Sequence, residues 1–391
     1  MRFNPLKSIF ANRPKPDSEV ETFSPHSPRY AYTFQSFYEK PRILILVDNV
    51  RATYFLSFHY ILKRLHNTES LAFFVIDSAE ITRWTRNKSP EDFVSQVIED
   101  VRPSAVIFSR YGVPHGDVLP GLFKARSIAT VCHIDDDLLN INSALGEEIQ
   151  NRQGDPVVLK ARQALLEETD LIYASTAVLG DRLTKQFPDQ KIFYGDVDAL
   201  YLDFLLSEDS PAENKTLTFG YMGSKGHQED LDAIAPDITQ ILTQYPKTRF
   251  EIFGTIDMPE ALKAFSKRTK SYKTNPDYAG FLNQLNQLGW AIGLAPLQDT
   301  EFNHCKTPTK YVEYTTCSIP TIASSGPVYE QFQPDEQIII ASPDEWTAKI
   351  SQLIEDPALR QRLVANGKQY CEENFNLFKL EAQVKELMAL V

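Results

Sequence analysis

The sequence has no long apolar run, no closely spaced cysteines and no excess of basic residues, and each absence excludes a class of protein. No stretch approaches the roughly 20 consecutive apolar residues that cross a bilayer, which argues against a transmembrane helix. The four cysteines show no C-x-x-C spacing; they are Cys132, Cys305, Cys317 and Cys371. We expect them to be reduced thiols of a cytosolic protein and not a disulfide or zinc framework.

The charge balance is acidic. The formal net charge is −12 over 391 residues, whereas a nucleic-acid-binding domain usually presents a basic face. We therefore expect a protein that does not bind nucleic acid, and the cysteine pattern described above predicts that it is cytoplasmic.

The amino-terminal stretch "MRFNPLKSIFANRPKP" has no continuous apolar region, so it is not a signal peptide. Phe3, Leu6, Ile9 and Phe10 have near-helical spacing among basic residues, a pattern that also fits a weak membrane-surface anchor. We favour a terminus that is disordered or packs on its own domain. The alternative would make the protein peripheral at the inner face of the membrane.

The length and the 42% hydrophobic content predict two domains, each with its own core. Short apolar strands alternate with helices, are interrupted by the polar, turn-rich "LLSEDSPAENK", and then resume. The predicted parts are an extension at 1–40, a first domain at 41–204, a linker at 205–215, a second domain at 216–375, and a helix at 376–391 that can cross back to the first domain.

Alternation of this kind predicts two doubly wound α/β domains with buried parallel sheets. Ligands of such sheets bind beyond the carboxyl ends of the strands. With two domains facing each other, the cleft between them is the expected site.

One segment, "FNHCKTPTKYVEYTTCSIPTIASS", places cations where a helix begins. Pro308 suits the first helical position and Thr307 can cap it, so Lys310 lies in the first turn. A cation opposes the helix dipole there, whereas a bound polyanion would be attracted by the helix, Lys306 and Lys310 together. Glu313, one turn further, can accept hydrogen bonds from sugar hydroxyls. The alternative is an ordinary surface Lys–Glu pair.

The wider segment "GWAIGLAPLQDTEFNHCKTPTKYVEYTTCSIPTIASS" resembles the donor-binding segment of group 1 glycosyltransferases of the GT-B fold. The matching positions are Ile292 to Leu297, Phe302, Asn303, Lys306, Lys310, Glu313, Tyr314 and Ile319 to Ser324. Two further stretches, 217–231 and 169–183, resemble the glycine turn of the second domain and the end of the first. Together the similar stretches cover most of residues 42–375.

The resemblance implies two Rossmann-like domains, with the nucleotide sugar in the second domain and a glycan or glycolipid acceptor in the first. It implies a hexosyl- or deoxyhexosyltransferase that retains the anomeric configuration and functions in bacterial surface-polysaccharide assembly. No cofactor and no metal are required, since lysines and helix N–H groups can stabilise the leaving diphosphate.

The sequence also departs from the family pattern. The first glutamate of the family's Glu-x7-Glu pair falls on Cys305, "GDVD" (195–198) replaces Asn-Gly-Val-Asp, and "DNVRATYF" (48–55) replaces a glycine-rich loop. These departures keep two alternatives open. One is a GT-B-like sugar-nucleotide epimerase, and the other is a non-catalytic partner protein on this fold.

In the first domain, "VCHIDDDLLN" places His133, Asp135, Asp136 and Asp137 at the end of a buried strand. We predict catalytic roles for His133, Asp135 and Asp136, because this is where a parallel strand meets the expected cleft. If the reaction inverts, one of them is the base. The alternative is a solvated loop that caps the next helix. The D-x-D spacing is a metal signature of a different fold, so we expect no metal.

The turn "GYMGSKGHQED" supplies further candidate donor contacts. Gly223 permits close backbone approach, and Ser224, Lys225 and His227 follow it. Asn303, in the lysine segment, completes the predicted donor-binding set.

Overall fold

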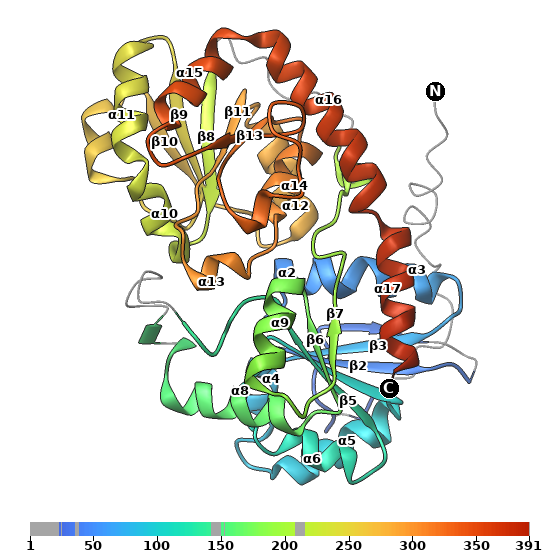
Figure 1. Ribbon diagram of the computed structural model, residues 1–391. Helices are drawn as coiled ribbons and strands as arrows, with labels where there is room; N and C mark the ends of the chain where they lie inside the picture. Colours follow the sequence, from blue (N-terminus) through green and yellow to red (C-terminus); the bar gives the residue numbers. More distant parts are fainter. Residues whose placement is uncertain are drawn as a thin grey trace. The chain divides into compact units, whose positions relative to one another are not determined.

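The computed structural model describes residues 23–24, 26–35, 39–141, 150–151, 153–207 and 216–390, which divide into two compact units (Figure 1). Unit 1 comprises the described residues within Met1–Asn140, Arg152–Asp196 and Leu377–Val391. Unit 2 comprises those within Ile141–Asn151 and Val197–Asn376. The stretch from Phe3 to Phe10 and residues 208–215 of the predicted linker lie outside the described residues.

Unit 1 is built on a seven-stranded sheet in the order β1-β3-β2-β4-β5-β6-β7. All neighbours are parallel except β1, which pairs antiparallel with β3. Most of its strands are runs of buried apolar residues, as expected for a parallel sheet covered on both faces. The strands are β1 (Tyr32–Phe34), β2 (Arg42–Val47), β3 (Ala72–Asp77), β4 (Ala105–Ser109), β5 (Ala129–Ile134), β6 (Leu171–Ala174) and β7 (Ile192–Tyr194).

Helices α4, α5, α8 and α9 of unit 1 begin at a side-chain cap that the sequence supplies. Asp155 accepts from the N–H of Val157 with Pro156 at the first helical position, and Ser89 and Asp92 form a capping box. The helices are α2 (Ala52–Tyr54), the π-helical η1 (Phe55–His59), α3 (Tyr60–Asn67), α4 (Ser78–Trp84), α5 (Pro90–Val101), α6 (Leu119–Lys124), α8 (Pro156–Glu168), α9 (Ala177–Gln186) and α17 (Leu377–Ala389).

The last helix, α17, packs within unit 1. Its Glu381 forms an ion pair with Arg64 of α3 at 2.7 Å. Gln383 donates to the Tyr173 hydroxyl at 2.6 Å and accepts from the N–H of Asp196 at 2.7 Å. These contacts join the chain's end to α3, β6 and the segment after β7.

Unit 2 contains a six-stranded, all-parallel sheet in the order β10-β9-β8-β11-β12-β13. Its central strands are buried, and helices cover the sheet on both sides (Figure 1). The strands are β8 (Thr218–Gly223), β9 (Arg249–Gly254), β10 (Thr269–Tyr272), β11 (Ile292–Ala295), β12 (Thr321–Ser324) and β13 (Ile339–Ala341).

The helices of unit 2 alternate with these strands. They are η3 (Asp203–Leu205), η4 (Lys225–His227), α10 (Gln228–Ala233), α11 (Ala235–Gln244), η5 (Glu260–Phe265), α12 (Tyr278–Gln287), α13 (Glu301–His304), α14 (Thr309–Thr316), η6 (Pro327–Tyr329), α15 (Trp346–Glu355) and α16 (Pro357–Asn374). The predicted fold class, two doubly wound α/β units, is confirmed.

The strand orders locate one switch point in each sheet, where successive connections run in opposite directions. In the seven-stranded sheet of unit 1 (sheet A) the switch lies between β2 and β4, and in the six-stranded sheet of unit 2 (sheet B) it lies between β8 and β11. Ligands of doubly wound sheets bind outside the carboxyl ends of the strands at such points. The residues that follow β2, β4, β8 and β11 are therefore the first place to look for a site.

Gly254 is the last residue of β9, which pairs with the switch-point strand β8. Its φ is +146°, and a Cβ atom there would lie 1.9 Å from the carbonyl oxygen of Gly223. We expect Gly254→Ala to lower the free energy of unfolding by about 2–4 kcal/mol, because backbone strain and overpacking add. Urea unfolding would measure this.

The matched control is Gly121→Ala in α6, where a Cβ meets nothing within 4 Å. Equal unfolding midpoints for Gly254→Ala and Gly121→Ala would show that the β9 turn tolerates a side chain.

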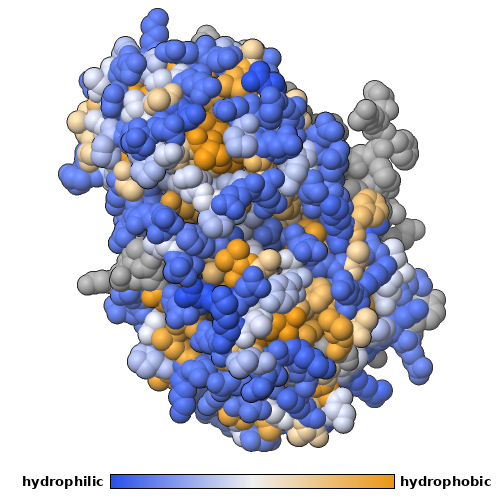
Figure 2. All heavy atoms as spheres, in the orientation of Figure 1, coloured by the Kyte–Doolittle hydropathy of each residue, from blue (hydrophilic) through white to orange (hydrophobic). Residues whose placement is uncertain are grey.

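Figure 2 shows hydrophilic residues over most of the visible face, with apolar residues gathered in smaller patches. Within the part of the chain that the structure describes, no helix has the length and apolar character needed to cross a membrane.

Candidate functional site

Five polar residues gather at the switch point of sheet B and form what we call the lysine cluster: His227, Asp230, Lys306, Lys310 and Glu313. His227 ends η4 and Asp230 lies in α10, directly after β8. Lys306 follows α13, and Lys310 and Glu313 lie on α14. Both predicted donor-binding segments, the turn after β8 and the lysine segment, thus meet at one place.

His227 links the two sides of the cluster. Its Nδ1 lies 2.7 Å from Oδ2 of Asp230, and its Nε2 lies 3.4 Å from Nζ of Lys310. Burial, Lys310 and Lys306 lower the pKa of His227 to about 4, so the ring is neutral at pH 7. Since the Asp230 carboxylate only accepts, Nδ1 carries the proton and Nε2 accepts from the Lys310 ammonium.

Asp230 was not among the predicted site residues, yet it organises them. Oδ1 of Asp230 accepts from the N–H of Gln298 at 2.8 Å and from Nδ2 of Asn303 at 3.3 Å. Burial opposes ionisation of Asp230, but His227 and the Gln298 N–H outweigh it and hold the pKa below its usual range. Asn303 is buried in this network and also donates to the Gln298 carbonyl, so the structure places it behind the cluster as a support. Its predicted role in donor binding stays a prediction.

Glu313 is the buried carboxyl of the cluster. It is 6% exposed, and Oε1 accepts from the hydroxyl of Tyr278 at 2.8 Å. Burial raises the pKa of Glu313 to about 7, while Tyr278 and Lys310 act in the opposite direction. The cluster therefore has two ammonium groups, one firmly ionised carboxylate at Asp230 and one carboxyl that is half protonated near neutral pH, which leaves an excess of positive charge.

The beginning of α14 adds to that excess. The helix starts at Thr309 with Pro308 in the N-cap position, and no side chain among the described residues caps it. The predicted cap by Thr307 is wrong, because its hydroxyl contacts the Thr309 hydroxyl at 2.5 Å instead. A helix start without a side-chain cap, beside Lys306 and Lys310, favours an anion.

The glycine turn after β8 lies next to the cluster. A Cβ on Gly223 would lie 2.8 Å from Cε1 of Tyr221, so the backbone runs against this ring with no room for a side chain. Lys310 lies with Nζ 5.8 Å from the centroid of the same ring. Ser224 and Lys225 are exposed, and the Lys225 N–H donates to Thr255.

In unit 1, the predicted acids Asp135 and Asp136 lie at the carboxyl end of β5 and share a cation. Arg110, which follows β4, forms ion pairs with both, at 2.8 Å to Oδ2 of Asp136. Thr53 donates to Asp135 at 2.7 Å. Burial raises the pKa of Asp135 although Arg110 opposes the shift.

Sequence reasoning missed Arg110 because no motif contains it. Its φ is +51°, a left-handed conformation that is strained for a residue with a side chain and that recurs at functional sites. It directly follows β4 at the switch point of sheet A, so its placement depends on the strand order and not on local sequence.

The other residues of "HIDDD" have structural partners. His133 is fully buried, with its ring nitrogens 3.0 Å from the hydroxyls of Ser109 and Ser175. Burial lowers its pKa to about 3. Asp137 is also buried and pairs with Arg182 at 2.6 Å. The catalytic role of His133 stays a prediction, and in this structure the ring does not reach the surface.

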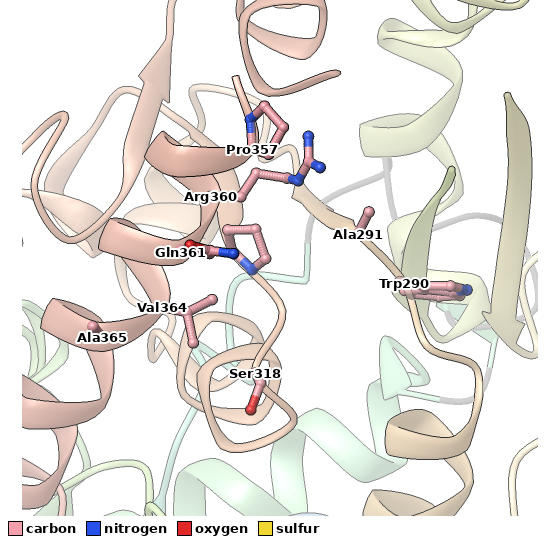
Figure 3. Close-up of a pocket in the computed structure, with 9 residues that line it drawn as sticks. Trp290, Ala291, Ser318, Pro357, Arg360, Gln361, Val364 and Ala365 are labelled. Carbon is pink, nitrogen blue, oxygen red and sulfur yellow. The ribbon is translucent and has the colours of Figure 1, made fainter. Parts of the chain in front are cut away.

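A pocket of about 350 Å³ in unit 2 lies elsewhere (Figure 3). Trp290 and Ala291, which precede β11, lie on one side, and α16 residues including Arg360 and Gln361 lie on the other. Ser318, which precedes β12, also lines it. These are the amino ends of the strands, whereas the lysine cluster lies at the carboxyl ends. The pocket is therefore separate from the candidate site.

The raised pKa of Glu313 predicts a pH dependence of stability. Its pKa moves from 4.5 to about 7 on folding, so the native state binds more protons than the unfolded chain between these values. The stabilisation is complete below about pH 4.5 and is lost as the pH rises through 7. Relative to Glu313→Gln, wild type should lose up to about 3 kcal/mol between pH 4.5 and pH 8.

Urea unfolding of both proteins at several pH values would test this. Parallel stability curves for wild type and Glu313→Gln would contradict the assignment of the buried proton to Glu313.

Comparison with known proteins agrees with this architecture. Residues 237–384, which include Lys306, Lys310 and Glu313, match a family model described as glycosyl transferase-like. No curated protein matches the sequence at a significant level.

Several solved structures share the fold. The sucrose-phosphate synthase from Thermosynechococcus elongatus has a TM-score of 0.60 at 11% identity, covering 90% of this chain and 98% of that chain. Anabaena HepE in complex with UDP-glucose has a TM-score of 0.59 at 12% identity, covering 90% and 100%. A UDP-forming α,α-trehalose-phosphate synthase from Burkholderia xenovorans has a TM-score of 0.59 at 10% identity, covering 90% and 98%.

The chain therefore has the GT-B fold, as the sequence motifs implied. The predicted resemblance to group 1 glycosyltransferases is confirmed by the family match, which covers residues 237–384 and includes three of the five cluster residues, Lys306, Lys310 and Glu313.

Proposed function

We propose that this protein is a glycosyltransferase that takes a sugar from a nucleotide-activated donor, whose diphosphate binds at the lysine cluster. The observation that carries the proposal is the meeting of Lys306, Lys310 and the beginning of α14 around a neutral His227. Two cations and a helix N-terminus at the switch point of a Rossmann-like sheet match the charge and position of a donor diphosphate.

The chemistry follows from where charge develops. As the bond between the sugar and the diphosphate breaks, negative charge grows on the leaving phosphate oxygen. Lys306, Lys310 and the helix N–H groups stabilise that charge without rearrangement, which lowers the barrier. Glu313, when ionised, accepts hydrogen bonds from the ribose hydroxyls. Asp230 and His227 act as positioning residues, because their hydrogen bonds hold the Lys310 ammonium in place.

Unit 1 would hold the acceptor, a glycan or glycolipid, near Asp135 and Asp136. In a retaining reaction the departing phosphate takes the acceptor proton, and the carboxylates orient the acceptor hydroxyl. In an inverting reaction one of them is the base. We favour retention, a hexosyl or deoxyhexosyl donor and bacterial surface-polysaccharide assembly, and family resemblance is the support for all three. For a cytoplasmic location the support is the scattered cysteines, which show no C-x-x-C spacing.

The choice of nucleotide can be narrowed. HepE was solved in complexes with UDP-glucose and with UDP, and the Burkholderia xenovorans synthase is UDP-forming. We therefore propose uridine donors as the first to test.

The test is a thermal-shift screen of nucleoside diphosphates and their sugars, followed by a release assay with candidate acceptors. A ligand present at 100 times its Kd should stabilise its unit by about 2.7 kcal/mol and raise the melting temperature. Nucleoside diphosphate release that needs an acceptor would support transfer and exclude the epimerase alternative. No shift with any nucleotide at millimolar concentration would favour the non-catalytic alternative.

A further inference from the structure

A run of cations around β10 stands out from the acidic chain. Residues 261–276 contain Lys263, Lys267, Arg268, Lys270 and Lys273 but no Asp or Glu. Acidic residues outnumber basic ones by 52 to 40 over the whole sequence, so the net charge of this segment is opposite in sign to that of the whole chain. Figure 1 shows β10 at the edge of the sheet in unit 2.

The neighbouring strand brings two more cations to this edge. Arg249 begins β9, and Lys247 precedes it by two residues; both are exposed. In the parallel pairing, Thr269 of β10 lies opposite Phe250 of β9, which puts Arg249 next to the start of β10. Strands pair at a spacing of about 4.8 Å, so Lys247 and Arg249 lie near Lys267, just before β10. Lys270 within β10 and Lys273 just after it continue the row along the edge of the sheet.

Arg268 connects the start of β10 to the end of α11 and to η5. Its guanidinium donates to the carbonyls of Leu242 at 2.6 Å and Tyr245 at 3.3 Å, and it lies 5.2 Å from the centroid of the Phe265 ring. Arg268 therefore serves the fold, while the cations around it remain on the surface.

We define the basic strip as the exposed cations Lys247, Arg249, Lys263, Lys267, Lys270 and Lys273. Lys263 pairs with Glu260, and Lys270 lies over the Tyr272 ring at 4.4 Å. For the other four, the described residues supply no carboxylate within ion-pair distance. Cations held close together without anions repel one another, so an anionic partner would be attracted to them.

Protection of a sheet edge does not account for the strip. Lysines on an edge strand discourage pairing with another chain. Lys270 lies within β10, but the other five cations lie before it, after it or at β9.

We propose that the basic strip docks unit 2 on an anionic phospholipid surface. Five of its six cations are lysines, whose ammonium groups act as point charges and suit a fluid layer of headgroups. Binding of single-stranded nucleic acid relies on exposed aromatic rings for stacking. Tyr272 is a poor platform, because Lys270 covers its ring and its hydroxyl donates to Glu251 at 3.1 Å. This inference does not depend on the proposed transferase activity.

The test is co-sedimentation of the full chain with vesicles of phosphatidylcholine alone or with 30% phosphatidylglycerol. The variant replaces Lys267, Lys270 and Lys273 by Gln. Each lost cation should weaken binding to anionic vesicles about fivefold, or about a hundredfold in total. The matched control replaces three exposed lysines of unit 1 by Gln, namely Lys160, Lys185 and Lys191.

The expected result is binding to the anionic vesicles that the control variant retains, the strip variant loses and raised salt weakens. Melting curves establish that all variants are folded. Absence of binding to anionic vesicles, or equal binding by the two triple variants, would overturn the proposal. Strip-dependent binding to a homopolymeric RNA but not to vesicles would also overturn it and assign the surface to nucleic acid.

Discussion

Lys310→Ala should weaken nucleoside diphosphate binding by about 1.5–3 kcal/mol, the range of a lost hydrogen bond to a charged group. It should lower turnover further, by about 10²- to 10³-fold, because the leaving group gains charge in the transition state. The structural basis is the position of the Lys310 ammonium, fixed by Nε2 of His227 at 3.4 Å beside the start of α14.

Isothermal calorimetry with UDP and steady-state kinetics would measure the two losses. Lys349→Ala is a suitable control, since it removes the same charge from α15 of the same unit, away from the cluster. Lys306→Ala should show similar losses of diphosphate affinity and of turnover. If both variants bind the diphosphate as tightly as wild type, the site is misassigned and the pair is a surface feature.

Asp135→Asn should lower turnover by about 10²-fold while leaving donor affinity unchanged, because in the retaining reaction that we favour Asp135 orients the acceptor hydroxyl. If the reaction inverts and Asp135 is the base, the loss should reach about 10²- to 10⁴-fold. The substitution keeps the shape of the side chain, and Arg110 keeps its ion pair with Asp136. A loss in kcat without a loss in nucleotide affinity is the signature of a group that acts at the reacting centre.

The control is Asp189→Asn, an exposed carboxylate of unit 1. If Asp135→Asn turns over at the wild-type rate, Asp135 has no catalytic role and serves only as a structural ion-pair partner of Arg110.

Much of the fold could be predicted from the sequence, because the features that mark its helices and strands lie within short stretches of the chain. The start of α8 is an example, because Asp155 and Pro156 are a cap and a first helical residue that the sequence itself displays. Apolar runs such as "RILILV" marked the buried parallel strands. β1 and β10 give no such signal, because "YTF" and "TKSY" are short and lack the apolar run of a buried strand. Their strand character comes from pairing with β3 and β9.

The candidate site was predictable only where family motifs cover it. Lys306, Lys310 and Glu313 were found through one segment, whereas Asp230 and Tyr278 contact that segment from 73 and 35 residues away along the chain. Local sequence does not reveal which distant side chain meets a given residue.

Buried polar residues in unit 1 illustrate the same limit. His133 ends an apolar strand in the sequence, and nothing local shows that its ring lies between Ser109 and Ser175. The alternation of side chains along β5 allows the His133 ring to lie on either face of the sheet, and the pairing of β5 with β4 and β6 determines which neighbours it meets.

The most direct test of the account is a crystal structure of the chain with UDP bound at saturating concentration. We predict that the diphosphate contacts the ammonium groups of Lys306 and Lys310 at the beginning of α14, with the ribose hydroxyls at Glu313. A diphosphate bound elsewhere, whether in the pocket beside Arg360 or in unit 1, would contradict the assignment of the lysine cluster as the donor site.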